Sequence, residues 1–160
     1  MYSSYTVRDM NSLWHFEGTL IASSSSKAPN KPRWIEFDLY KTSSGTYILS
    51  RVGQSILFHS KSCKTVTRNK LTPIAPNMLS PEAAMCLDCM PIAEAESELY
   101  PETPRYFAQK TTTAKGVIAA VTQHDENNSE YLTNVAKRLL LQAADNDENI
   151  GQVLFDRYVD

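Results

Sequence analysis

The sequence is short of the residues on which several common catalytic sites depend. It has only five glycines among 160 residues, and they are scattered. A phosphate-binding loop or a dinucleotide fingerprint needs closely spaced glycines, so neither is present. The order of residues supports no Ser-His-Asp arrangement either. We therefore expect a protein that binds rather than one that catalyses.

The chain also has a small net charge and no long apolar run. The net charge is −2 and the pI is near 5.9, so the chain as a whole does not attract nucleic acid or membranes. No apolar run approaches the ~18–20 residues of a membrane span. Residues 1–6 lack the basic and apolar regions of a secretory signal. We expect a cytoplasmic protein with reduced thiols, folded as a single domain over residues 1–160.

There are only three cysteines, and they lie between residues 63 and 89. An odd number argues against a framework made only of disulfides. Cys86 and Cys89 are two residues apart, which lets both sulfurs bind one metal ion, and His59 and Cys63 supply a second pair. Four thiolate and imidazole ligands are typical of a structural zinc site. The sequence therefore predicts a structural Zn²⁺ held by His59, Cys63, Cys86 and Cys89.

Other interpretations of these residues remain open. In one interpretation, Cys86 and Cys89 form a redox pair, although such pairs usually lie at the start of a helix that follows a strand. In another interpretation, all three cysteines are ordinary buried thiols. His15 and His124 are alternatives to His59 as the fourth ligand.

Hydrophobic periodicity predicts an α+β fold that begins with an antiparallel β-meander. Strands are expected over residues 13–22, 34–40, 46–52 and 55–59, with turns at 43–45 and 53–54 and a bulge at Gly18. Residues 1–12 are expected to be loose, and residues 105–110 to form a short strand or turn. The β-sheet part is assigned to residues 13–59 and the zinc-binding connection to residues 59–91.

A three-helix segment is predicted over residues 112–159. Apolar residues at helical spacing mark each helix. Thr112 or Thr113 is expected to cap the first helix, Thr133 the second, and an aspartate after residue 144 the third, whose apolar face ends at Tyr158. From residue 113 onward there are four basic and eight acidic residues, so this segment is not expected to bind DNA.

Two carboxylates on one predicted strand suggest a second hypothesis. Glu36 and Asp38 are two residues apart, so their side chains share one face, and Lys41 follows. Acidic residues with a lysine can hold Mg²⁺ in a metal-dependent nuclease. The plainer interpretation is that both acids solvate the outer face of an antiparallel sheet.

A basic segment beside the zinc ligands suggests a third hypothesis. Between residues 59 and 70 there are four cations and no acid, so the segment can contact phosphates: Lys61, Lys64, Arg68 and Lys70. It lacks the interleaved aromatic residues of single-strand binders, and a solvated loop explains it as well. The acidic helical segment instead favours a protein partner, for example a host nucleic-acid machine that the chain would inhibit. The sequence leaves the oligomeric state open.

One pattern in the chain resembles small uncharacterised zinc-knuckle proteins of phages and mobile elements. Its first part is the run Trp34-x-Glu36-x-x-Leu39-Tyr40-Lys41-Thr42-x-x-Gly45-x-Tyr47, and its second part is the four predicted zinc ligands. With the helical segment, the resemblance covers residues 34–158. It implies an accessory protein encoded by a phage or mobile element, and it implies no activity.

Overall fold

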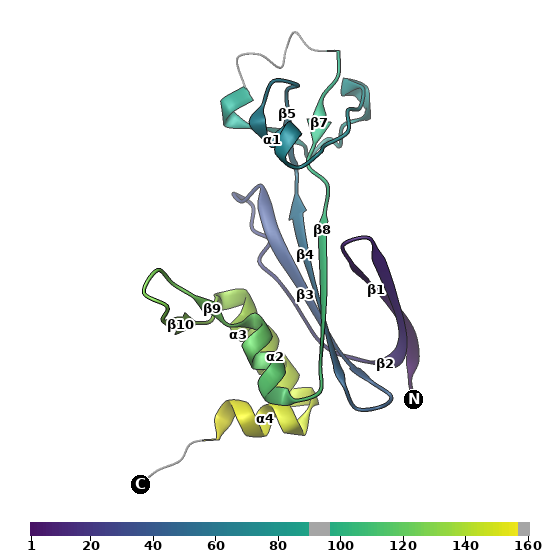
Figure 1. The fold of residues 1–160 in the computed structure, drawn as a ribbon, viewed down its shortest axis with the longest axis vertical. Coiled ribbons are helices and arrows are strands. Elements are labelled where there is room, and N and C mark those ends of the chain that lie inside the picture. The colour runs from purple at the N-terminus through teal and green to yellow at the C-terminus, as the bar shows by residue number, and fades with distance from the viewer. Residues whose placement is uncertain (90–96, 157–160) are drawn as a thin grey trace. The chain divides into compact units, whose positions relative to one another are not determined.

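The computed structural model describes residues 1–89 and 97–156 and shows an α+β protein (Figure 1). The chain divides into two compact units. The first unit comprises Met1–Ser26, Ile35–Val52 and Arg105–Asp160, and the second comprises Lys27–Trp34 and Gly53–Pro104. The predicted α+β class is confirmed, whereas the single domain over residues 1–160 stays a prediction. The ends of the predicted spans 59–91 and 112–159, with Tyr158, lie outside the described residues.

The first unit contains a five-stranded antiparallel sheet in the order β1-β2-β3-β4-β8. Its strands are β1 (Ser3–Asp9), β2 (Ser12–Ser25), β3 (Arg33–Thr42), β4 (Tyr47–Ser55) and β8 (Arg105–Thr111). The sheet curls, because the end of β1 approaches β8 and the backbone N–H of Met10 donates to the carbonyl of Tyr106 at 2.8 Å. The first four strands are consecutive in the chain, so the predicted antiparallel meander is present, but it includes β1 and does not include the strand expected over residues 55–59.

Each face of this sheet carries a hydrophobic cluster, and the side chains of each strand alternate between the two faces. On β3, Phe37 and Leu39 are buried in the larger hydrophobic cluster, together with residues of the helices. Tyr40 points to the opposite face, where its ring lies 4.7 Å from that of Tyr5 and 5.1 Å from that of Phe16. The period-two pattern read from the sequence therefore places residues of β3 on the correct faces.

Three helices lie beside this sheet in the first unit (Figure 1): α2 (Ala114–Val121), α3 (Asn134–Asn146) and α4 (Glu148–Phe155). The side chains of Thr113, Thr133 and Asp147 each accept a hydrogen bond from a backbone N–H three residues later, so each caps a helix as predicted. A short hairpin of β9 (Gln123–His124) and β10 (Glu130–Tyr131) connects α2 to α3. Throughout the described residues, each helix is too short or too polar to cross a membrane.

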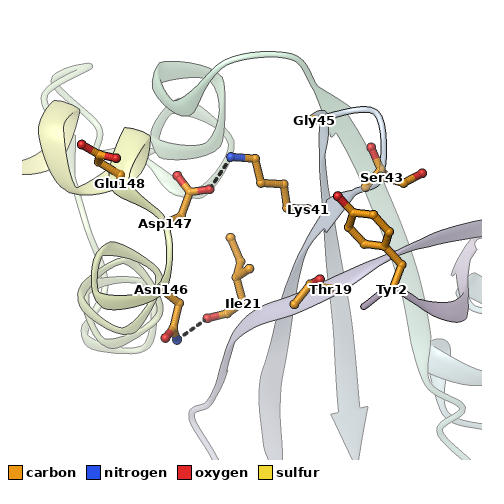
Figure 2. Close-up of a pocket in the computed structure, with 10 residues that line it drawn as sticks. Tyr2, Thr19, Ile21, Lys41, Ser43, Gly45, Asn146, Asp147 and Glu148 are labelled. Carbon is orange, nitrogen blue, oxygen red and sulfur yellow. Dashed lines mark hydrogen bonds and ion pairs between the residues drawn. The ribbon is translucent and has the colours of Figure 1, made fainter.

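Asp147 does more than cap α4 (Figure 2). Its side chain is 2% exposed, and one carboxylate oxygen lies 2.8 Å from Nζ of Lys41. The other oxygen accepts from the hydroxyl of Tyr47 at 2.9 Å and from the backbone N–H of Ile150 at 3.0 Å. Burial alone would raise the pKa of Asp147, but these donors lower it below its ordinary value. One carboxylate thus joins β3, β4 and the start of α4.

Several predicted boundaries are wrong. Residues 3–9 form β1 rather than a loose segment, because the backbone of β1 pairs along its whole length with residues 12–18 of β2. The bulge in β2 lies between Leu20 and Ala22 instead of at Gly18. Gly18 is required for a different reason: a Cβ there would stand 2.3 Å from the carbonyl oxygen of Lys41 on β3. Gly53 and Gln54 form no turn, since they lie inside β4.

The second unit is built around a small sheet that the sequence did not suggest. Its order is β6-β5-β7, with β5 (Leu57–His59) parallel to β6 (Ala84–Met85) and antiparallel to β7 (Tyr100–Pro101). The expected strand over residues 55–59 therefore leaves the meander and becomes the centre of another sheet. The described residues between β5 and β7 also form helix α1 (Lys64–Arg68) and two short 3₁₀ helices, η1 (Pro76–Met78) and η2 (Leu87–Cys89).

Candidate metal centre

The small sheet of the second unit brings its strand ends together. His59 is the last residue of β5, and Cys86 follows β6 directly, where its N–H donates to the carbonyl of Phe58 at 3.0 Å. Cys63 closes a tight turn through its N–H to the carbonyl of Ser60 at 3.1 Å. Cys89 closes a similar turn back to Cys86 at 2.9 Å. Two turns and two strand ends therefore present four side chains to one point.

The four side chains are close enough to hold one metal ion. Their ligand atoms all lie within 4.8 Å of one another. Nδ1 of His59 lies 3.4 Å from Sγ of Cys63 and 4.0 Å from Sγ of Cys89. In a tetrahedral site with ordinary zinc bond lengths, neighbouring ligand atoms are about 3.5–3.8 Å apart. The group of His59, Cys63, Cys86 and Cys89 can therefore bind a metal with little rearrangement.

The imidazole of His59 is oriented by a buried carboxylate. His59 is 1% exposed, and its Nε2 lies 2.6 Å from Oε2 of Glu102, whose side chain is 5% exposed. Burial would raise the pKa of Glu102, but hydrogen bonds from Arg33, Ser55 and His59 lower it to about 2. A carboxylate oxygen accepts, so Nε2 is the donor in this hydrogen bond, and Nδ1 is the ring nitrogen that lies toward the sulfurs. This arrangement is typical of a metal-bound histidine.

Glu102 is itself held by Arg33, and sequence reasoning missed both residues. Nε of Arg33 donates to Oε1 of Glu102 at 2.8 Å, and a second guanidinium nitrogen donates to Oε2. The N–H of Glu102 donates to the carbonyl of Leu57, which fixes the acid beside β5. No motif in the sequence indicates that Glu102 contacts His59, because the two residues are 43 positions apart.

The surroundings shift the pKa values of Cys63 and Cys89 in opposite directions. Burial would raise the pKa of Cys63, but hydrogen bonds from Thr65 and contacts with Cys89 and His59 lower it to about 7. Burial raises the pKa of Cys89, although the backbone N–H and side chain of Ser60 oppose that rise. Metals bind thiolates, so a pKa near neutrality at Cys63 favours metal binding at physiological pH.

The two alternative histidines, His15 and His124, belong to the first unit and not to the group of four. His15 is on β2, where its ring lies 3.0 Å from the hydroxyl of Thr6. His124 is on β9, half exposed and 3.6 Å from a carboxylate oxygen of Glu130. Neither belongs to the group of four close ligand atoms, which His59 completes.

The other predicted site residues do not form a comparable cluster. Glu36 and Asp38 are partly buried on β3, and Asp38 accepts a hydrogen bond from the hydroxyl of Ser23. Lys41 has the opposite parity on the strand and pairs with Asp147, so it does not join the two acids. A Mg²⁺ site at Glu36 and Asp38 remains a hypothesis from the sequence, and Lys41 is not part of it.

The four basic residues of the third hypothesis are all exposed in the second unit. Lys61 lies before Cys63, Lys64 and Arg68 are the first and last residues of α1, and Lys70 follows the helix. All four therefore lie within seven residues of Cys63 in the sequence.

No protein-family model, curated protein or solved structure matches this chain.

Proposed function

We propose that the chain is a non-enzymatic binding protein whose second unit folds around one structural zinc ion. The observation that carries the proposal is the group of three cysteines and one histidine, with ligand atoms within 4.8 Å of one another. Three soft sulfur ligands and one imidazole favour zinc over magnesium or calcium, which prefer oxygen. Glu102 would then be the group that orients the histidine ligand.

The small hydrophobic core of the second unit supports a structural role for the metal. This unit has about sixty residues. Among those described, its hydrophobic cluster has two buried members, Phe58 and Leu99, packed with Leu79, Ala83 and Met85. A core of this size rarely supplies more than about 3–5 kcal/mol, and small domains compensate with metals or disulfides. Structural zinc contributes about 10–16 kcal/mol of apparent binding free energy to small zinc-dependent folds.

The closed ligand set supports a non-enzymatic role. Catalytic zinc sites use three protein ligands and keep one position for water or substrate. Here four protein ligands would fill the tetrahedron, and two of them, His59 and Cys89, are 1% and 2% exposed. A substrate would have to displace a ligand to reach the metal. The chemistry of the site is therefore that of a cross-link between β5, α1 and β6.

The sequence also suggested a protein partner, an origin in a phage or mobile element, and inhibition of a host nucleic-acid machine. These remain predictions. The Mg²⁺-dependent nuclease remains the enzymatic alternative, and a Glu36→Gln variant that abolished Mg²⁺-dependent cleavage would be needed to support it.

Native mass spectrometry of the purified chain tests the proposal. We expect one zinc per chain, removed by a strong chelator and restored by added Zn²⁺. A chain that carries no metal, and that takes up none from a stoichiometric amount of Zn²⁺ under reducing conditions, would contradict the proposal.

A further inference from the structure

Helix α1 is fixed at both ends although it has only five residues. A helix of this length does not form by itself in water. The metal ligand Cys63 precedes it as the N-cap residue. After its end, the N–H of Lys70 donates to the carbonyl of Thr67 and the N–H of Leu71 to that of Val66. With Lys70 at φ 52°, these bonds form a Schellman motif, which stops the helix at a defined point.

The charges on this helix have opposing effects on its stability, because Arg68 in the last turn is favourable to the helix dipole and Lys64 in the first turn is not. Lys64 is its first residue, where the helix dipole disfavours a cation. Lys64 and Arg68 are four residues apart on one face, and like charges at that spacing cost a few tenths of a kcal/mol. Lys64, Arg68 and Lys70 make no salt bridge with any part of the chain that the structure describes. A role outside the folded chain explains these cations better than a role in its stability.

The composition of the exposed surface indicates which partner fits. The exposed side chains of residues 61–70 are, besides the four cations, only small polar groups: Ser62, Thr67 and Asn69. Basic residues with serine, threonine and asparagine are the usual donors to nucleic-acid phosphates. Protein interfaces are instead depleted in lysine and enriched in aromatic residues and methionine. The surface therefore fits a polyphosphate backbone better than a protein.

We infer that this surface, formed by Lys61, Lys64, Arg68 and Lys70, binds the phosphate backbone of a double-stranded nucleic acid. The inference rests on the proposed function, because the zinc ion would hold Cys63 and hence α1 in place. In the second unit no described aromatic side chain is exposed, since Phe58 and Tyr100 are buried and Trp34 is half-buried. Stacking on unpaired bases is therefore absent from the described surface, and a duplex offers the higher charge density. Recognition is independent of sequence.

Fluorescence anisotropy with a labelled DNA duplex of arbitrary sequence tests the inference. Binding should weaken linearly on a log–log plot against salt, with a slope of about −0.9 per contacted phosphate, hence about −2 to −4 for this surface. The same sequence as a single strand should bind more weakly. An RNA duplex of that sequence shows which nucleic acid is preferred. Replacing all four cations by glutamine should remove most of the binding and bring the slope toward zero.

A matched control is available in the first unit. Replacing one arginine and three lysines there by glutamine makes the same change in net charge: Arg105, Lys110, Lys115 and Lys137, all exposed. This control should bind the duplex as the unaltered chain does. Equal losses in the two variants would overturn the inference, because the effect would then come from net charge alone. The inference would also be overturned if a protein ligand bound through these four residues and the duplex did not bind.

Zinc content, measured on the same samples, separates the inference from the proposed function. A quadruple variant that retains one zinc per chain and loses the duplex supports both. An unaltered chain with one zinc and no affinity for the duplex at about 50 mM salt overturns the inference and leaves the proposed function in place. A chain without zinc overturns the proposed function first.

Discussion

Replacing Cys86 by serine is expected to weaken zinc binding by about a hundred- to a thousandfold. Serine has almost the same shape, and Cys86 is only partly buried, so the substitution removes a thiolate with little change in packing. Four ligands share about 10–16 kcal/mol of apparent binding free energy, which gives roughly 2.5–4 kcal/mol for each. Each 1.4 kcal/mol is a factor of ten in affinity. Competition with a chromogenic chelator measures the loss.

Two further variants grade this result. Glu102→Gln keeps all four ligands but weakens the carboxylate's hydrogen bond to His59 and its ion pair with Arg33, so we expect a smaller loss of about ten- to a hundredfold. His124→Gln should leave the affinity unchanged, because His124 lies outside the group. If Cys86→Ser bound zinc as tightly as the unaltered chain, or if His124→Gln were the variant that lost it, the ligand assignment would be wrong.

Replacing Asp147 by alanine is expected to destabilise the first unit by about 3 kcal/mol. The change leaves the hydroxyl of Tyr47 without its acceptor in a position that is 1% exposed, which costs about 1–3 kcal/mol. It also removes the N-cap of α4, worth about 0.5–2 kcal/mol. Lys41 loses its partner too, but its side chain is 32% exposed, so water offsets much of that loss. Chemical denaturation followed by circular dichroism measures the change.

Asp145→Ala is the matched control for this prediction. Asp145 is exposed, two residues away, and carries the same charge, so its loss should change stability by no more than about 0.5 kcal/mol. Because the pKa of Asp147 is lowered in the folded state, its stabilisation is present above the ordinary value of 3.8 and is lost as the pH falls through the lower value. Equal effects of the two substitutions would contradict the assigned role of Asp147.

The parts of the fold that local patterns determine were predictable from the sequence. Thr113, Thr133 and Asp147 cap helices because capping depends on residues within one turn. The alternation along β3 likewise assigns Phe37 and Tyr40 to opposite faces. The spacing of the cysteines and the histidine was also informative, since few ligand types bind zinc and turns of two or three residues bring neighbouring ligands together.

The features that sequence reasoning missed depend on contacts between distant residues. Residues 3–9 are mostly polar, yet they form a strand because β2 offers a full row of backbone partners and Tyr5 and Val7 pack in the smaller hydrophobic cluster. The run Leu57–His59 looked like the last strand of the meander, but it pairs with β6 and β7, which have two residues each and no detectable pattern. Glu102 and Arg33 could not be linked to His59, because nothing local specifies that ion pair.

Hydrogen exchange with and without a chelator tests the central claim most directly, because it reports on each unit separately. If zinc holds the second unit together, the chelator should abolish the protection of amides in β5, β6 and β7. The amides of β1–β3 in the first unit, and of α3, should keep theirs. Protection that stays the same in both units after the metal has been removed would contradict the claim.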